Sequence, residues 1–209
     1  MSQRFLQPQL AATDLGCEFD QQESNHLTKV LRKRVGDIVE ITNGKGDLFE
    51  GVIVDSHPKR SKVKLNFIKH ESASKAPIAI ALGVPKSTDR FEWFLEKATE
   101  IGIDHIIPLQ SRFSERKSLN YDRSLRIIES AFKQSLRLHI PKLSELSLFE
   151  TLLEQSKEYD QRFIGHCYPS EQKPDLSELI ETNRSKIVLI GPEGDFSEEE
   201  VARALDSEF

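Results

Sequence analysis

Hydrophobic and polar residues alternate along the first seventy positions in a way that predicts β-strands. The segments "GDIVEIT" (36–42) and "LFEGVIVDS" (48–56) flank "NGKG", an Asn-Gly turn signal, and "KVKLNFIKH" (62–70) alternates again. Two alternating runs joined by such a turn predict a β-hairpin, here followed by a third strand. Gly44 and Gly46 therefore belong to a hairpin turn, since a dinucleotide-binding fingerprint needs a strand before it and a helix after it.

The pattern changes after the polar stretch "ESASKAP" (71–77), which is typical of a linker. The next run, "IAIALGV" (78–84), is apolar throughout, as in a parallel strand buried on both faces. Further strands are expected at 103–109, 162–168 and 186–190. Helices are expected at 89–101, opened by Asp89 with Glu92 and stopped by Gly102, at 121–138, at 175–182, and at 197–205, opened by Ser197. Strands that alternate with helices predict an α/β domain with a mostly parallel sheet.

Length and composition limit the class of protein. The chain has 209 residues, which is long enough for two domains with their own cores, and a net charge of −5. It contains no apolar run that could span a bilayer, and "MSQRFLQPQL" lacks the features of a signal peptide. Cys17 and Cys167 have no partner spacing, and the histidines show no metal-ligand spacing. We expect a cytoplasmic protein with reduced cysteines, no membrane segment and no metal.

Charge is divided unevenly along the chain. Residues 1–143 carry 23 Lys and Arg against 18 Asp and Glu, whereas residues 144–209 carry 6 against 16. The net charge is therefore +5 in the first part and −10 in the second, which together give the −5 of the whole chain. The two parts are expected to face different partners, although blocks of like charge are also common on solvated surfaces.

Cations gather on one face of the expected helix 121–138 and on its neighbours. At about 100° per residue, a single stripe of that helix collects Arg123, Arg126, Ser130, Lys133 and Arg137. Further cations come from the preceding helix and from the loop "SRFSERK" between the two, namely Arg90, Arg112 and Arg116. This distribution is typical of a surface that follows a phosphodiester backbone, but an ordinary amphipathic helix has the same spacing. The segment "NHLTKVLRKRVGD", with Arg32 and Arg34, has the same two interpretations.

The segment "IGPEGDFSEEE" (190–200) places a glycine-proline turn and two acids between an expected strand and an expected helix. Pro192 removes a backbone donor, and Glu193 and Asp195 repel phosphate, so this turn is not a phosphate cradle. The chain contains neither of the common glycine-rich phosphate-binding motifs. A neutral or cationic ligand such as S-adenosylmethionine suits the turn, and so does a purely structural role.

Four segments together resemble one known family. The segments "HLTKVLRKRVGD", "GVPKSTDRFEWFLEKATEIGIDHIIPLQSRFSER", "AFKQSLRLHIP" and "LIGPEGDFSEEEV", in this order, are similar to the RsmE-type 16S ribosomal RNA uracil-N3 methyltransferases of the SPOUT class. The resemblance implies an N-terminal PUA-like β-barrel at 1–72 and a SPOUT α/β domain with a mostly parallel sheet and a trefoil knot at 73–209. It also implies a homodimer that transfers a methyl group from S-adenosylmethionine to a specific uridine of 16S rRNA or of the small ribosomal subunit.

The resemblance also assigns roles to residues. It places the cofactor at Gly165, His166, Ile190, Gly191, Pro192, Glu193 and Gly194. The residues expected to contact RNA are Arg32, Arg34, Lys86, Arg116, Arg123, Arg126 and Lys133. Because uracil N3 carries a proton, the reaction needs either its removal or stabilisation of the uracil anion. Arg90, Arg112 and Arg137 are the candidates for stabilising charge, and Glu100 or Glu193 for accepting the proton.

The chain departs from the family pattern at two places. Asp195 stands where the family usually has glycine, and aspartate tolerates left-handed backbone well enough for the turn to survive. The family also continues beyond the last expected helix with a strand and a further cofactor loop, so we expect a truncated chain with an incomplete knot and weak cofactor binding. The alternatives are a non-catalytic RNA-binding module and an ordinary nucleotide-dependent enzyme, the latter disfavoured by the missing phosphate motifs.

Overall fold

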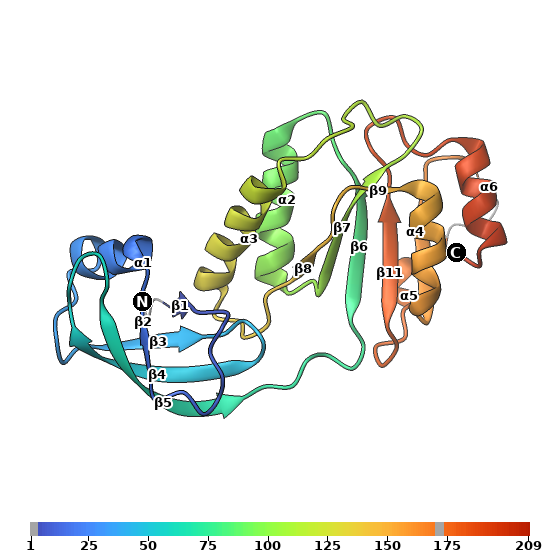
Figure 1. The fold of residues 1–209 in the computed structure, drawn as a ribbon. Coiled ribbons are helices and arrows are strands. Elements are labelled where there is room, and N and C mark those ends of the chain that lie inside the picture. Colours follow the sequence, from blue (N-terminus) through green and yellow to red (C-terminus); the bar gives the residue numbers. More distant parts are fainter. Residues whose placement is uncertain (1–3, 170–173) are drawn as a thin grey trace. The chain divides into compact units, whose positions relative to one another are not determined.

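The structure is a computed structural model that describes residues 4–169 and 174–209. The chain forms two compact units, Met1–Ala73 with Phe132–Ile140, and Ser74–Ala131 with Pro141–Phe209 (Figure 1). Within the described residues, no helix combines the length and the hydrophobicity that crossing a bilayer requires.

The first unit is built on a five-stranded sheet with the order β1-β3-β4-β5-β2. Its strands are β1 (Arg4–Leu6), β2 (Gly16–Glu18), β3 (Ile38–Thr42), β4 (Asp47–Asp55) and β5 (Lys62–His70). The predicted hairpin and third strand are thus confirmed as β3, β4 and β5, which pair antiparallel. The turn between β3 and β4 needs its glycines because Gly44 and Gly46 have φ of 71° and 105°.

Alternation along these strands builds the core of the first unit. Phe5, Ile41, Phe49, Ile53 and Val63 are among its buried side chains. Asp20 caps the short helix α1 (Gln21–Asn25) through its side chain, and the π-helical turn η1 (His26–Val30) follows directly. Helical structure thus runs from Gln21 into the first part of the cation-rich segment "NHLTKVLRKRVGD".

The second unit contains a sheet in which every described pair of strands is parallel. Its order is β10-β11-β6-β7-β8, with β9 also paired to β7. The strands are β6 (Ile78–Gly83), β7 (His105–Gln110), β8 (Lys142–Leu143), β9 (Ser147–Leu148), β10 (Gln161–Gly165) and β11 (Lys186–Ile190). The α/β architecture with a parallel sheet is confirmed.

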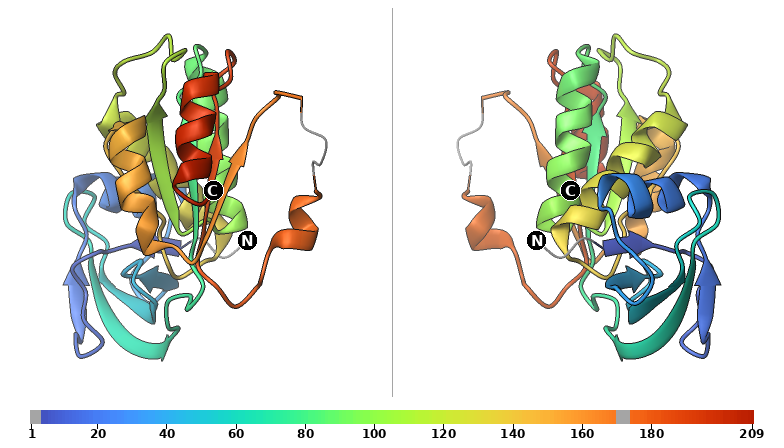
Figure 2. Two further views of the ribbon diagram at one scale, coloured as in Figure 1. Left: turned by 90° about the vertical axis from the view of Figure 1, so that its right-hand side faces the viewer. Right: turned by 90° about the vertical axis from the view of Figure 1, so that its left-hand side faces the viewer.

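Helices cover both faces of this sheet. Helix α2 (Thr88–Ile101) and the first part of α3 (Tyr121–Ser135) lie on one side, and α4 (Phe149–Gln155) and α6 (Glu198–Asp206) on the other (Figures 1 and 2). The short helix α5 (Leu176–Leu179) and the single 3₁₀ turn η2 (Ser156–Glu158) complete the unit. The face under α4 and α6 packs Ile107, Leu189, Leu152, Phe196 and Val201 into one core.

Several boundaries differ from the sequence prediction: α5 covers only Leu176–Leu179 of the expected 175–182, and β10 ends at Gly165 and not at 168. Helix α2 starts at Thr88, one residue before the expected 89, because the side chain of Ser87, and not of Asp89, accepts the hydrogen bond from the backbone N–H of Arg90. Its predicted stop at Gly102 is confirmed, with φ of 89°. Helix α3 ends at Ser135 and not at 138, because Leu136 adopts φ of 58°. Arg137 therefore does not continue the cationic stripe of the helix.

Candidate functional site

Three strands of the second unit end side by side at the carboxyl edge of the sheet. The register aligns Gly165 of β10 with Ile190 of β11, and Ile190 with Leu82 of β6. The chain leaves this edge through three segments: 84–87 (the β6 exit loop), 166–168 (the β10 exit loop) and 191–197 (the β11 exit loop). In open parallel sheets, ligands bind outside the carboxyl ends of strands, so these three loops form the candidate site.

The β6 and β11 strands approach so closely at this edge that one position must be glycine. A Cβ atom on Gly83 would lie 2.5 Å from Cδ of Pro192 and closer still to its nitrogen. Any side chain at Gly83 would therefore push the β11 exit loop away from the end of β6. By contrast, a Cβ on Gly165 would meet only Leu189 O, at an ordinary 3.8 Å.

Glu193 joins the β11 exit loop to the β6 exit loop. The backbone N–H of Lys86 donates to both carboxylate oxygens of Glu193, at 3.2 and 3.3 Å. On its other side, the carbonyl of Lys86 accepts a hydrogen bond from Nη2 of Arg116, at 2.9 Å. One residue of the β6 exit loop thus connects an acid of the candidate cofactor loop to an arginine expected to bind RNA.

Asp195 joins the β11 exit loop to the β10 exit loop. Its carboxylate accepts from the backbone N–H of Cys167 at 2.7 Å and from that of Phe196 at 2.8 Å. The hydroxyl of Tyr168 donates to the carbonyl of Phe196 at 2.8 Å and reinforces the same link. Asp195 has φ of 62°, so the prediction that aspartate accepts the left-handed position is confirmed.

The start of α6 fixes the end of the β11 exit loop. Ser197 and Glu200 form a reciprocal capping box, which confirms the predicted helix start. The second oxygen of Glu200 accepts from the backbone N–H of Arg112 at 2.8 Å, and the guanidinium of Arg112 pairs with Glu199 at 2.5 Å. The segment after β7 is therefore held against this helix start.

These contacts limit the ligand that the exit loops can hold. Glu193 and Asp195 use their oxygens to bind backbone N–H groups, so they take up donors that a phosphate would need and leave negative charge in place. Nδ1 of His166 is buried and has no hydrogen-bond partner within the described residues, so one donor or acceptor remains for a ligand. Such a site favours a neutral or cationic ligand.

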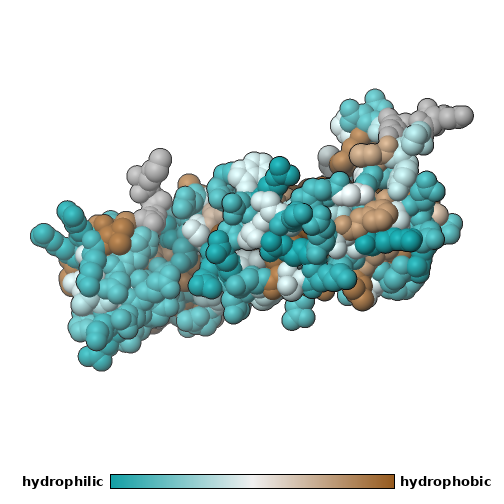
Figure 3. All heavy atoms as spheres, turned by 90° about the horizontal axis from the view of Figure 1, so that it is seen from above, coloured by the Kyte–Doolittle hydropathy of each residue, from teal (hydrophilic) through white to brown (hydrophobic). Residues whose placement is uncertain are grey.

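Several expected RNA contacts, together with the catalytic candidate Arg90, belong to the β6 exit loop, α2 and α3. Lys86 and Arg90 are exposed, and Lys86 forms an ion pair with Glu115 at 2.9 Å. Arg123 is held by both oxygens of Glu92, at 2.5 and 2.9 Å. Arg126, also exposed, donates to the carbonyl of Asp122 one turn before it. The surface that carries the exit loops is largely hydrophilic, with scattered apolar areas (Figure 3).

Other expected site residues lie elsewhere. Glu100 is near the end of α2, about 18 Å along the helix from Thr88 at 1.5 Å per residue, and it accepts from Lys97 at 3.0 Å. Arg137 belongs to the first unit, where its carbonyl accepts from Arg4 at 3.0 Å. Lys133 is also in the first unit and forms an ion pair with the buried Glu23. The exposed Arg32 and Arg34 follow η1 in that unit.

The amino-acid sequence alone did not reveal the contacts that assemble the site. It did not single out Gly83, the backbone N–H of Lys86 or the link from Asp195 to Cys167. A glycine at the end of a buried strand was the only available signal for the first of these. No group of three His, Cys, Asp or Glu side chains suited to a metal occurs among residues 4–169 and 174–209.

Comparisons with known proteins agree with this geometry. A protein-family model described as "RNA methyltransferase domain" matches residues 72–209, and another described as "RNA methyltransferase PUA domain" matches residues 19–66. The ribosomal RNA small subunit methyltransferase E of Bacillus subtilis is 25% identical over 201 residues, which cover 90% of this chain and 77% of the relative.

Solved structures share the fold. A probable rRNA-methyltransferase from Porphyromonas gingivalis is 30% identical, with a TM-score of 0.85 over 99% of this chain and 87% of that one. A ribosomal RNA small subunit methyltransferase E from Neisseria gonorrhoeae, bound to S-adenosyl methionine, is 22% identical, with a TM-score of 0.86 over 100% and 87%. The five-stranded first unit is thus PUA-like, and the chain belongs to the RNA methyltransferase family, in its RsmE type.

Proposed function

We propose that this protein transfers the methyl group of S-adenosylmethionine to N3 of a specific uridine in 16S rRNA of the small ribosomal subunit. The family membership and the small-subunit methyltransferases among its relatives support the reaction class. The observation that carries the proposal is the arrangement of Glu193 and Asp195, whose carboxylates bind the backbone of two neighbouring exit loops. The acidic β11 exit loop disfavours phosphates and suits a sulfonium ligand.

The residues at the exit loops fit this cofactor. Gly165 and His166 at the end of β10, and Ile190, Gly191, Pro192, Glu193 and Gly194 after β11, are the proposed binding residues. The unpartnered Nδ1 of His166 and the half-exposed Ile190 offer one polar and one apolar contact. When bound, the cofactor supplies an electrophilic methyl group next to a positive sulfur.

The side chains near this edge perform the remaining chemistry. Loss of the N3 proton leaves negative charge on the uracil oxygens, and cations stabilise it. Arg90 is the proposed stabilising group with the most freedom, since it forms no ion pair within the described residues, whereas Arg112 is paired with Glu199. Glu193 is the proposed proton acceptor because its carboxylate lies at the exit loops, whereas Glu100 lies near the far end of α2. Arg137 stays a candidate from the sequence alone.

The wider assignments are also proposals. The PUA-like unit, residues 1–72, is proposed to bind RNA through Arg32 and Arg34, and residues 73–209 to carry the methyltransferase site. The homodimer and the trefoil knot remain predictions from the resemblance, and the cytoplasmic location remains a prediction from the composition and the N-terminal sequence.

Methyl transfer to isolated small ribosomal subunits that lack the modification tests the proposal. Digestion of the rRNA and mass spectrometry should reveal N3-methyluridine only when the protein and S-adenosylmethionine are both present. Glu193→Gln keeps an acceptor for Lys86 N–H but loses both the charge and the proposed proton acceptor. It should lower turnover about 100-fold and also weaken cofactor binding. RNA binding without any methyl transfer would instead favour a non-catalytic RNA-binding module.

A further inference from the structure

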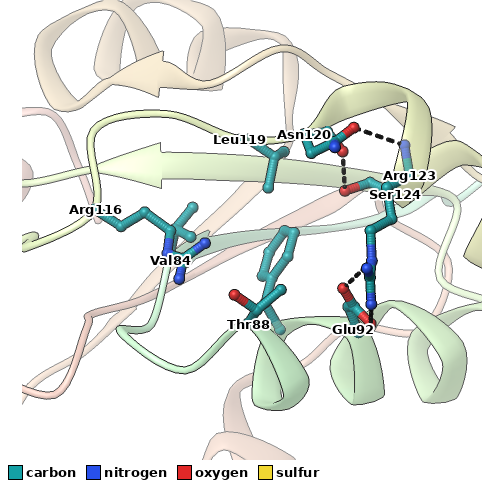
Figure 4. Close-up of a pocket in the computed structure, with 9 residues that line it drawn as sticks. Val84, Thr88, Glu92, Arg116, Leu119, Asn120, Arg123 and Ser124 are labelled. Carbon is teal, nitrogen blue, oxygen red and sulfur yellow. Dashed lines mark hydrogen bonds and ion pairs between the residues drawn. The ribbon is translucent and has the colours of Figure 1, made fainter.

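A small pocket opens between the starts of α2 and α3, entirely within the second unit. It is lined by Val84 of the β6 exit loop, by the first turns of α2 and α3, and by the segment that precedes α3 (Figure 4). Its polar lining residues are Thr88, Glu92, Arg116, Asn120, Arg123 and Ser124. Arg116 and Arg123 of this lining are among the expected RNA contacts, but the proposed methyl transfer gives the pocket itself no role.

The pocket carries one positive charge that no carboxylate balances. Glu92 binds Arg123 through both oxygens, at 2.5 and 2.9 Å, so these two charges offset each other (Figure 4). Arg116 forms no ion pair with any residue between 4 and 169 or between 174 and 209. Its only described hydrogen bond goes from Nη2 to the carbonyl of Lys86, which leaves most of its N–H donors open.

The other polar groups of the pocket also offer donors. The hydroxyl of Thr88 has no hydrogen-bond partner within the described part of the chain. Asn120 accepts the backbone N–H of Arg123 with its side-chain oxygen, so its amide N–H groups are open. Thr88 also lies in the first turn of a 14-residue helix, where the backbone adds positive potential. A ligand at this point is met by donors and a net positive charge.

The size of the pocket suits a small anion. Its volume of about 40 Å³ corresponds to roughly three waters when each needs about 10–15 Å³. That is enough for a tetrahedral oxyanion. The apolar walls, Val84, Leu119 and the buried ring of Phe91, exclude further water from the anion.

We propose that this pocket binds one backbone phosphate of the substrate RNA, next to the nucleotide that receives the methyl group. Lys86 supplies the connection, because its carbonyl holds Arg116 at the pocket while its N–H holds Glu193 in the β11 exit loop. A phosphate in the pocket thereby fixes the RNA strand at a short distance from the proposed cofactor loop. This inference rests on the proposed function for the identity of the polyanion.

Fluorescence anisotropy with short RNAs tests the inference. The probe is a uridine-centred single-stranded pentanucleotide, compared with versions in which one phosphate at a time is replaced by an uncharged methylphosphonate. Arg116→Gln should weaken binding of the normal RNA about tenfold and lower the salt dependence by about 0.7. Methylphosphonate at one position should weaken RNA binding by the wild type by the same factor as Arg116→Gln does. The same replacement should not weaken RNA binding by Arg116→Gln any further.

Two further variants keep the test decisive. Arg184→Gln removes an exposed arginine of the same unit, outside the pocket, and should leave both affinities unchanged. Thr88→Val removes a hydroxyl at nearly constant shape and should reduce affinity severalfold at the same phosphate position, even if Arg116→Gln is poorly folded. If the affinity losses from Arg116→Gln and from methylphosphonate simply add at every phosphate position, the proposed phosphate subsite is wrong.

Separate measurements test the proposed function. Cofactor binding by calorimetry and methyl transfer to small subunits report on the exit loops. Methyl transfer without coupling between Arg116 and one phosphate would reject the pocket and keep the enzyme. Coupling without methyl transfer would support the pocket as a phosphate site and reject the enzyme.

Discussion

The two edges of the parallel sheet in the second unit both hold polar side chains. They differ in whether the polar atoms of those side chains already have partners in the protein. At the carboxyl edge, the carboxylates of Glu193 and Asp195 accept hydrogen bonds from backbone N–H groups, while Arg116 and His166 keep unused polar atoms. At the amino edge, His105 lines a larger pocket of about 170 Å³. There Nδ1 of His105 bonds with Tyr159 Oη at 2.9 Å, and Nε2 bonds with Ser144 Oγ at 2.7 Å.

Burial makes His105 a structural residue. It lowers the pKa of His105 to about 4, with a further contribution from Lys142, so the ring is neutral at pH 7. Both ring nitrogens already have partners in the protein, so no polar atom is left for a ligand. The larger cavity is therefore the weaker candidate, because unused polar groups mark a binding site better than volume does.

The sharpest test of the carboxyl edge is the substitution Gly83→Ala. The added Cβ would meet the backbone of Pro192 and cannot be accommodated without moving the β11 exit loop. We expect a loss of about 3 kcal/mol in the free energy of unfolding by urea and a parallel loss of S-adenosylmethionine binding.

Gly165→Ala is the matched control at the neighbouring strand end. Its Cβ would have only ordinary contacts, so the free energy of unfolding should change by less than about 0.5 kcal/mol. Equal effects of the two substitutions would mean that the close approach of β6 and β11 does not organise the site.

The link between two exit loops is tested at Asp195. Asp195→Ala removes the acceptor of the Cys167 and Phe196 N–H groups and leaves a Cβ residue at φ of 62°. We expect a loss of about 2 kcal/mol in unfolding free energy. Asp195→Asn, which keeps an acceptor and tolerates the left-handed backbone, should recover about half of it. An unchanged midpoint in urea for Asp195→Ala would contradict the role of this carboxylate.

The amino edge makes a smaller, pH-dependent contribution. Because the folded-state pKa of His105 lies below the ordinary 6.5, the unfolded chain binds the proton more readily between pH 6.5 and about 4. This contribution to stability is complete above pH 6.5 and is lost as the pH falls toward 4. With allowance for partial solvent exposure, the loss is about 1 kcal/mol.

The substitution His105→Gln isolates that contribution. The difference in unfolding free energy between wild type and variant should shrink as the pH falls from 7 to 4.5. A difference that stays constant over this range would show that His105 does not titrate as its burial requires.

Local patterns were sufficient for most elements. The hairpin of β3 and β4, the buried strand β6, the stop at Gly102 and the capping box of Ser197 with Glu200 all follow from spacings of a few residues. Short elements such as β8, β9 and α4 were not predicted, because two to seven residues carry too little periodicity to reveal a strand or a helix. The end of α3 was misplaced because the left-handed Leu136 has no glycine to signal it.

The amino-acid sequence by itself determined the division into a β-rich part and an α/β part, the acidic turn after β11 and the presence of many arginines. Only the tertiary structure decided which of these residues meet. The contacts of Glu193 with Lys86 and of Asp195 with Cys167 span 107 and 28 positions, and both involve backbone N–H groups, which every residue type except proline carries. Tertiary structure also separated Arg116, with donors open, from Lys133, paired with a buried acid, because the charge of a side chain does not reveal its partner.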